Sequence, residues 1–208
     1  NRKIFSDYIV YLKIIVNTLA QSYEYTNKII ETEKLEGEKS ALTRLSRTDE
    51  LTGILNRRGF IERGQTALDL MQETDMVGVV FFADMDGLKK INDTYGHEVG
   101  DLAIKTQAMA LKEVFRSTDV VGRLSGDEFG IVAVGMNLIQ VDRVRLKLDM
   151  MNEKLSRENN LPFTLSVSLG AVDLQKSSIL KKLLSDADKS LYEEKRKKRH
   201  ARLSENSK

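Results

Sequence analysis

Two short apolar segments separated by a tight turn constrain the fold of this chain most. Residues 120–124 and 129–134 are largely apolar, and Ser125-Gly126 after the first of them has the composition of a turn. The two segments therefore predict a hairpin of adjacent strands. Asp127 and Glu128 follow the turn, so two neighbouring carboxylates lie at the tip of the predicted hairpin.

A second carboxylate pair ends another apolar segment. Residues 77–83 form a continuous apolar run, which is typical of a central strand buried on both faces. Asp84 and Asp86 come at its end. Acidic side chains at two strand ends, with glycines nearby, can hold Mg²⁺ against phosphate groups. An acid in such a place is more often a solvated turn residue, but the combination indicates nucleotide chemistry.

Hydrophobic periodicity predicts the remaining elements. Helices are indicated over 60–72, 100–116, 138–158 and 178–200, and a strand is indicated by strict alternation over 163–171. Residues 48–59 are expected to form a short capped helix followed by a turn, and residues 92–97 are expected to form a loop. The order helix, strand, helix, hairpin, helix, strand, helix predicts an α+β fold in which helices cover a sheet.

Residues 1–46 predict one long helix. A heptad seam runs from Phe5 to Ile29, interrupted by the polar residues Ser22 and Thr26, and it decays at Glu33 and Glu36. We interpret the helix as a parallel dimerising stalk. The alternatives are a helix that packs on its own domain and the last helix of a preceding domain.

Composition and charge restrict the class of function. The chain has 41% hydrophobic residues and no cysteine, which fits a folded protein without disulfides or thiolate metal sites. The net charge is only +2, and basic residues concentrate after residue 194, so the rest of the chain offers no case for nucleic-acid binding. No apolar run approaches the ~20 residues that span a bilayer. We expect a cytoplasmic protein with an upstream sensor domain. Tethering to a membrane through that upstream region is the alternative.

Three further groups of residues suit a nucleotide, and each has a plainer interpretation. The loop over 86–92 offers backbone N–H groups to phosphates, or is an ordinary turn. Asn92 and Asp101 match the donors of guanine, although Asp101 is equally well placed to be a helix N-cap. Lys195 and Arg199 lie one helical turn apart and can hold a triphosphate, or belong to a solvated basic tail.

Several long motifs occur together in a fixed order. They are residues 49–58, residues 83–97 with Gly100-Asp101, residues 125–129, and residues 187–192 with Lys195 and Arg199. Together they resemble the GGDEF family of diguanylate cyclases over residues 48–200. The resemblance implies a palm-like α+β domain with a mixed, largely antiparallel sheet. The expected organisation is a signalling and dimerisation helix over 1–46, a GGDEF catalytic domain over 47–203 and a C-terminal tail over 204–208.

The resemblance also implies an activity and a dimer. The family condenses two GTP molecules into cyclic di-GMP and two pyrophosphates, between two domains that each hold one GTP. We therefore expect a diguanylate cyclase that uses Mg²⁺, with Mn²⁺ as the substitute ion, and that forms a homodimer through its N-terminal helix. One alternative is a weak or inactive GGDEF domain that binds cyclic di-GMP or GTP. Another is a structural module in which the stalk is the function.

By the same resemblance, matching residues receive roles at the substrate site. Those expected to assist deprotonation of the attacking 3′-hydroxyl are Asp127 and Glu128. Those expected to hold the metal are Asp84, Met85 through its carbonyl, and Asp127. Those expected to bind phosphates are Gly87, Leu88 and Lys89 through backbone N–H groups, with Lys195 and Arg199. Those expected to recognise guanine are Asn92 and Asp101.

Two features of the motifs bear on regulation and on activity. Arg116 and Asp119, which by themselves carry no functional signal, match the family's RxxD product-inhibition site. Ser125 replaces the first glycine of the family signature. If that position requires a positive φ, serine costs roughly 1–2 kcal/mol there. Because serine is small and polar, we expect activity to survive.

Overall fold

The computed structural model describes residues 19–30 and 47–205, without the side chains of Lys176 and residues 197–205. The chain divides into two units, Asn1–Ser46 and Arg47–Lys208. In the first unit, residues 19–30 are helical, and the rest of the predicted stalk lies outside the described residues. Among the helices that the structure describes, none combines the length and the apolar character needed to cross a bilayer.

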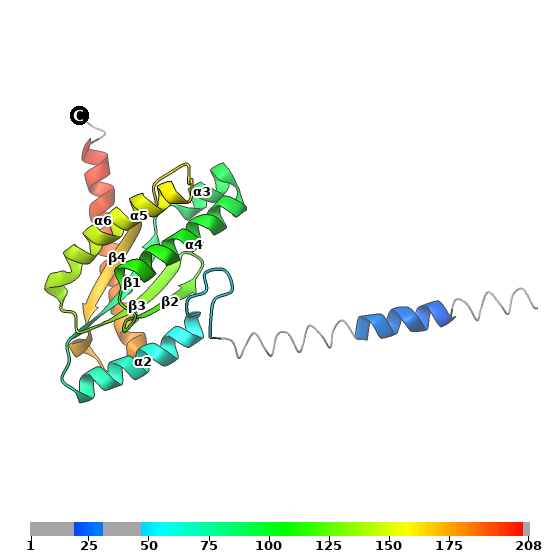
Figure 1. Ribbon diagram of the computed structural model, residues 1–208, viewed down its shortest axis with the longest axis horizontal. Helices are drawn as coiled ribbons and strands as arrows, with labels where there is room; N and C mark the ends of the chain where they lie inside the picture. The colour runs from blue at the N-terminus through cyan, green and yellow to red at the C-terminus, as the bar shows by residue number, and fades with distance from the viewer. Residues whose placement is uncertain (1–18, 31–46, 206–208) are drawn as a thin grey trace, which may run out of the picture. The chain divides into compact units, whose positions relative to one another are not determined.

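The second unit alternates helices and strands around one sheet (Figure 1). The helices are α2 (Arg57–Glu73), α3 (Leu88–Tyr95), α4 (His97–Val114), α5 (Val141–Glu158) and α6 (Leu180–Glu205), with 3-10 turns η1 (Leu138–Gln140) and η2 (Leu174–Lys176). The strands are β1 (Gly78–Met85), β2 (Val120–Ser125), β3 (Glu128–Val134) and β4 (Val167–Asp173). The α+β class is confirmed, and the predicted elements occur in the predicted order, with α3 as an additional helix between β1 and α4.

The strands form a four-stranded sheet in the order β2-β3-β1-β4. Each neighbouring pair is antiparallel, so β1 lies between β3 and β4. A parallel contact is present as an isolated bridge between Leu55 and Gly122. The register pairs Asp84 of β1 with Glu128 of β3 and with Ser168 of β4. The acids predicted at two strand ends are therefore direct neighbours.

Both faces of the sheet are covered, as the continuous apolar run of β1 predicts. Val79, Phe81 and the residues in phase with them pack with α4 and α5, whereas Val80 packs with α2 and α6. Successive side chains of a strand point to opposite faces. Asp84 is in phase with Val80, so its carboxylate lies on the face that α2 and α6 cover.

The short helix predicted to begin at Thr48 or Asp49 and to end before a turn at 56–59 is wrong. The segment is a turn in which the Thr52 N–H and hydroxyl both donate to the Asp49 carboxylate, at 2.9 Å and 2.6 Å. Asn56, expected in a turn, is the N-cap of α2, and its side-chain oxygen accepts the Gly59 N–H at 2.9 Å. Asp49 satisfies backbone and hydroxyl donors in a turn as readily as at a helix start, which is why composition did not separate the two.

Two other boundaries differ from prediction. Residues 92–95 belong to α3 and not to a loop, because Gly96, at φ +86°, joins α3 directly to α4. Strand β4 begins at Val167, four residues later than expected from the alternation. The Leu165 N–H donates to the Ser156 hydroxyl at 3.0 Å, so this part of the chain bonds to α5 instead of extending the sheet.

The close packing of α6 on β4 depends on Gly170. A Cβ at this position would lie 1.9 Å from the Ala187 carbonyl oxygen and 2.5 Å from the Leu191 nitrogen, both backbone atoms of α6. We expect Gly170→Ala to lower the free energy of unfolding by about 3 kcal/mol, measured by urea denaturation. The control is Ser178→Ala at an exposed position before α6, which should change it by less than about 0.5 kcal/mol. Equal stability of Gly170→Ala and the parent would contradict this packing.

Candidate active site

Three carboxylates gather where β1 and the β2–β3 hairpin end. Asp84 pairs with Glu128 across the two strands, and directly paired residues place their side chains on one face at short range. The Asp127 carbonyl accepts the Met85 N–H at 3.1 Å, which closes the hairpin tip onto the end of β1. The structure therefore brings together the catalytic and metal candidates Asp84, Met85, Asp127 and Glu128.

Asp84 lies in a negative environment that one lysine offsets. Its carboxylate is bound by the Lys195 ammonium at 2.6 Å, and 21% of its side chain is exposed. Burial raises the pKa of Asp84, the Lys195 ammonium opposes that rise, and the charges of Asp127 and Asp86 add to it, so the pKa is above its ordinary value. A cation bound at this position is therefore stabilising.

Glu128 shows the same crowding of negative charge. Burial raises its pKa, and the nearby charges of Asp84, Asp127 and Asp188 raise it further against the opposing effect of Arg57. A cavity of about 410 Å³ beside Glu128 is also lined by Arg57, Lys181 and Asp188. Glu128 thus holds a proton more readily than an exposed glutamate and has open space next to it.

The donor atoms at this edge fit a hard divalent cation. They are the carboxylates of Asp84 and Asp127 and the carbonyl of Met85, all oxygen. In the part of the chain that the structure describes, no group of three or more His, Cys, Asp or Glu could hold a metal by itself. Mg²⁺ is commonly bound by one or two carboxylates with substrate phosphates and water, so an incomplete protein set suits it. The Lys195 ammonium on Asp84 shows that this carboxylate accepts a cation.

Asp86, the second acid after β1, has a different role. Its carboxylate accepts hydrogen bonds from the hydroxyls of Ser166 and Ser168, at 2.7 Å and 2.8 Å, and its N–H donates to the Ser166 carbonyl at 2.8 Å. These bonds fasten the chain after β1 to β4. Ser166, just before β4, and Ser168, within β4, therefore hold the loop that follows β1.

The loop after β1 opens directly into α3. Gly87 is the N-cap of that helix, in the left-handed region at φ +81°, and Leu88 and Lys89 form its first turn. The first N–H groups of a helix have no partner within the helix. Gly87, Leu88 and Lys89 therefore carry backbone donors at the end of β1, as predicted for a phosphate-binding loop.

Asn92 and Asp101 come from two consecutive helices. Asn92 lies on α3 and Asp101 is exposed in the second turn of α4, whose N-cap is Gly96, so the interpretation of Asp101 as an N-cap is wrong. A Cβ on Gly100 would lie 1.8 Å from the Asn92 side-chain oxygen. The absence of a side chain at Gly100 thus lets Asn92 lie against α4 beside Asp101, a role that the sequence did not reveal.

Two side chains fix the part of α6 that carries Lys195. The Leu169 N–H donates to Glu194 at 3.3 Å, the Leu169 carbonyl accepts from Arg145 at 2.9 Å, and Arg145 forms an ion pair with Glu194. Leu169 lies on β4, the edge strand of the sheet, whose outer backbone groups need partners. Arg145 and Glu194 thus clamp α6 to β4, and no sequence pattern predicted this role for either residue. Arg199 also lies on α6, and its side chain is outside the description.

Arg123, just before the hairpin tip, connects the tip to the turn before α2. Its backbone N–H donates to the Leu55 carbonyl at 2.7 Å, its Nε donates to the Gly126 carbonyl at 2.8 Å, and its guanidinium bonds Asp49 at 3.1 Å. Only 15% of the Arg123 side chain is exposed. Arg123 therefore ties the hairpin tip that carries Asp127 to the turn before α2.

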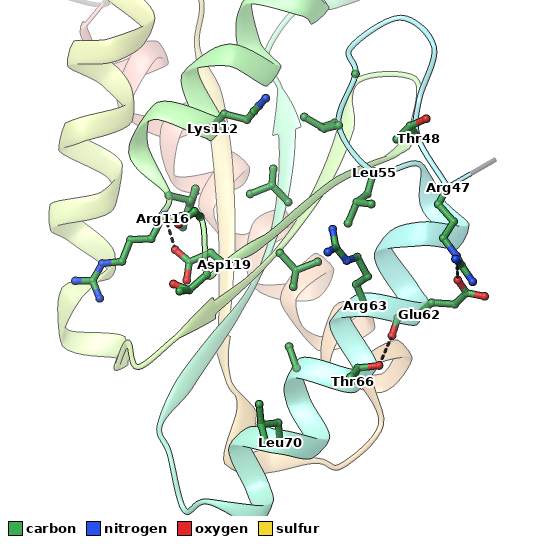
Figure 2. A pocket seen from close by; sticks show the side chains of 18 residues that line it. Arg47, Thr48, Leu55, Glu62, Arg63, Thr66, Leu70, Lys112, Arg116 and Asp119 are labelled. Atoms are coloured by element: carbon green, nitrogen blue, oxygen red, sulfur yellow. Dashed lines mark hydrogen bonds and ion pairs between the residues drawn. The ribbon is translucent and has the colours of Figure 1, made fainter.

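The predicted regulatory residues lie at a separate cavity, shown in Figure 2. This α2/α4 pocket has a volume of about 1090 Å³, and its lining includes Arg47, Leu55, Arg63, Lys112, Arg116 and Asp119. The Asp119 carboxylate accepts the N–H of Arg116 at 2.8 Å and the N–H of Val134 at 2.9 Å. The two predicted residues are thus close together, with Asp119 supporting the turn that carries Arg116.

Comparisons with known proteins agree with this geometry. The sequence profile described as "Diguanylate cyclase, GGDEF domain" matches residues 46–201, most of the chain. The chain belongs to the GGDEF domain family. It is 32% identical over 176 residues to a probable diguanylate cyclase, DgcC of Escherichia coli K12, across 84% of this chain and 46% of DgcC. The chain therefore spans about half the length of that relative.

Solved GGDEF structures share the fold. The GGDEF domain of PA1120 (TpbB or YfiN) from Pseudomonas aeruginosa is 30% identical, with a TM-score of 0.65 over 72% of this chain and 89% of that one. A microbial GGDEF domain described for its interaction with bis-(3′,5′)-cyclic di-GMP is 32% identical, with a TM-score of 0.60 over 72% and 92% of the two chains.

Ser125, which replaces the first glycine of the GGDEF signature, carries no backbone strain. Ser125 is the last residue of β2 and pairs with Glu128 after a shift in register. The positive φ of the turn falls on Gly126, at +38°, and the non-glycine residues with positive φ among those described are Asp75 and Asn160. The energetic cost considered for serine at this position therefore does not arise.

The anchor of the hairpin tip has a pH dependence that can be measured. Burial disfavours the charged form of Asp49, but hydrogen bonds from Thr52 and Arg123 outweigh burial and lower its pKa. A lowered pKa stabilises the folded state above the ordinary value of about 3.9, and this contribution is lost as the pH falls through the folded-state value. We expect Asp49→Asn to be less stable than the parent at pH 7, with the difference shrinking below pH ~4.

Urea denaturation of the GGDEF domain between pH 7 and pH 3 measures this difference. The control is Asp75→Asn, at an exposed position with a left-handed φ of 51° that asparagine adopts readily. This variant should follow the parent at each pH. A difference between Asp49→Asn and the parent that stays constant down to pH 3 would show that the charge of Asp49 does not hold the anchor.

Proposed function

We propose that this GGDEF domain joins two GTP molecules into cyclic di-GMP and releases two pyrophosphates. The observation that carries the proposal is the shared edge of Asp84, Asp127 and Glu128, with Lys195 bound to Asp84 at 2.6 Å. Acids that repel one another beside a partly exposed cationic side chain suit a ligand that carries both a divalent ion and phosphates. The curated relative DgcC is described as a probable diguanylate cyclase, which agrees with the proposal.

The metal proposed here is Mg²⁺, with Mn²⁺ as the substitute. Asp84, Asp127 and the Met85 carbonyl would hold it together with substrate phosphates. When bound, such an ion neutralises phosphate charge and makes a coordinated hydroxyl easier to deprotonate. Lys195 would leave Asp84 and, with Arg199, neutralise the triphosphate, while Gly87, Leu88 and Lys89 donate backbone N–H groups to it.

Glu128, together with Asp127, would assist removal of the proton from the attacking 3′-hydroxyl. The 3′-oxygen then bonds to the α-phosphorus of the other GTP as the bond to pyrophosphate breaks, and the proton passes to the carboxylate. A general base works best when its pKa approaches the working pH. The raised pKa of Glu128, caused by burial and by neighbouring acids, moves it in that direction.

Asn92 and Asp101 would select guanine. A carboxylate can accept both the N1–H and the N2–H₂ of guanine, whereas adenine presents an acceptor at N1. Asp101 is exposed on α4 and Asn92 lies beside it over Gly100, so both side chains can reach a base. We therefore propose GTP, and not ATP, as the substrate.

The reaction needs two copies of the domain, each with one GTP. We propose a homodimer that forms through the N-terminal helix, with the two substrate sites facing each other. Residues 19–30 are helical, and the heptad seam of the sequence runs through them. The substrate points to a cytoplasmic location, and an upstream sensor would act by changing how the two domains face each other.

A second candidate function is a binding module for cyclic di-GMP or GTP without turnover. Its support is the α2/α4 pocket, where Arg116 and Asp119 lie together. The same pocket would serve product inhibition in an active enzyme. Ser125 was the sequence feature that favoured this alternative. Its backbone is not in the left-handed region, so strain at this residue does not support a loss of activity.

Turnover is tested with dimeric protein, GTP and Mg²⁺, with the product identified by mass spectrometry. Glu128→Gln should lower the rate by about 10²–10⁴-fold, the usual contribution of a general base, and EDTA should abolish the reaction. The control is Glu73→Gln, which removes an exposed carboxylate at the end of α2 and should keep the parent rate. Absence of cyclic di-GMP production by dimeric protein that binds the nucleotide would favour the binding module.

The stalk is tested by deleting residues 1–46. Joining two domains raises their effective concentration, so the deletion should lower the rate per chain at nanomolar protein by at least about tenfold. The loss should disappear at high protein concentration, and fusion to an unrelated parallel coiled coil should restore the rate. A rate per chain that the deletion leaves unchanged at nanomolar concentration would refute this role.

A further inference from the structure

The ion pair between Arg145 and Glu194 joins helices that cover opposite faces of the sheet. Arg145 belongs to α5 and Glu194 to α6. Both side chains also bond the backbone of Leu169 on the edge strand β4. The Leu169 N–H donates to Glu194 at 3.3 Å, and the Leu169 carbonyl accepts from Arg145 at 2.9 Å. The clamp that these two residues form therefore passes around the edge of the sheet.

This ion pair is sheltered from water. The exposed fraction is 15% for the Glu194 side chain and 36% for the Arg145 side chain. The pair of Arg157 with Glu153, also on α5, has exposed fractions of 77% and 55%. Exposed pairs contribute little, because water screens the charges and both side chains lose freedom. Asp142 binds the Arg145 guanidinium at 2.9 Å as well, so the orientation of this side chain is fixed from two sides.

The clamp lies where the apolar packing of α6 ends. Leu191 is the last buried residue of α6 among those whose burial the structure describes. Beyond it, Glu194 bonds β4 and Arg145, and Lys195 bonds Asp84 at 2.6 Å. The position of this turn of α6 against the sheet therefore depends on polar contacts.

The clamp also holds β4 beside the residue that pairs with Asp84. Ser168, which precedes Leu169 in β4, is in register with Asp84 of β1. Glu194 directly precedes Lys195 in α6. Neighbouring residues of α6 thus contact neighbouring strands of the sheet, Glu194 at Leu169 and Lys195 at Asp84. Loss of the first contact would release the helical turn that makes the second.

We propose that Arg145 and Glu194 are positioning residues that hold Lys195 where its ammonium can meet the triphosphate of GTP. The inference rests on the proposed function, which supplies this ligand. In this role neither residue touches the nucleotide, and both act through the position of α6 against β4. The clamp keeps the Lys195 ammonium at the end of β1 when a metal and phosphates take its place on Asp84.

Isothermal titration of the dimeric full chain with Mg²⁺ and a GTP analogue that cannot release pyrophosphate tests this role. Arg145→Gln should weaken binding about tenfold, the usual effect of losing one charge-assisted contact. In a Lys195→Met background the same change should weaken binding by less than about twofold, because the contact through which the clamp acts is already absent. Equal weakening in the two backgrounds would overturn the proposal, as would parent affinity in Arg145→Gln.

Matched variants separate this role from general stability. Arg157→Gln removes an arginine–glutamate pair from the exposed face of the same helix and should keep the parent affinity. Glu194→Gln keeps an acceptor for the Leu169 N–H and loses the ion pair, so it should weaken binding as Arg145→Gln does. It replaces Arg145→Gln if that variant has a lowered urea midpoint. Arg145→Lys, which keeps the charge and loses the planar fork, should bind with intermediate affinity.

A measurement without nucleotide distinguishes this inference from the function on which it rests. The rate at which acetic anhydride acetylates Lys195, followed by mass spectrometry, reports whether its amine is bound to Asp84. This rate should rise by at least about threefold in Arg145→Gln, as expected for coupled neighbouring groups, and should keep the parent value in Arg157→Gln. A rate that does not rise in Arg145→Gln would overturn the clamp, even in a protein that turns over GTP. A faster rate in a protein that makes no cyclic di-GMP would support the positioning of Lys195 and contradict the cyclase.

Discussion

The crowding of carboxylates at one end of the sheet is the constraint on which the rest of the structure depends. Asp84 and Glu128 are paired across β1 and β3. Burial raises the pKa of both, the charge of Asp127 raises both further, and the charge of Asp84 adds to the rise at Glu128. A cation close by therefore stabilises the charged form of Asp84. Lys195 supplies that charge here, and we propose that a metal with substrate phosphates replaces it.

The edge of the sheet that carries Asp84, Asp127 and Glu128, here called the acid edge, is linked to the α2/α4 pocket through the turn before α2. Leu55 lines the pocket, and its carbonyl accepts the N–H of Arg123. The side chain of Arg123 in turn bonds Asp49 of the same turn and the Gly126 carbonyl at the hairpin tip. A continuous set of hydrogen bonds therefore joins the wall of the pocket to the loop that carries Asp127.

Local patterns predicted what depends on neighbouring residues, and missed what depends on distant ones. The hairpin, the buried strand and the acids at their ends follow from continuous apolar runs and turn composition. The contact of Asn92 with Gly100, the bonds of Arg123 to Asp49 and the clamp of Arg145 and Glu194 on β4 join residues that no single pattern contains. The loop expected over 92–97 was wrong for a similar reason, since one left-handed glycine let two helices meet.

The most direct test of this account is whether the acid edge binds a divalent cation together with a nucleotide. Electron paramagnetic resonance can measure Mn²⁺ bound to the dimeric protein in the presence of a GTP analogue that cannot release pyrophosphate. The account predicts that the parent binds Mn²⁺ with the analogue and that Asp84→Asn weakens this binding by at least about tenfold. Equal Mn²⁺ affinity in the two proteins would contradict it, because the acids would then be placed at this edge without holding a metal.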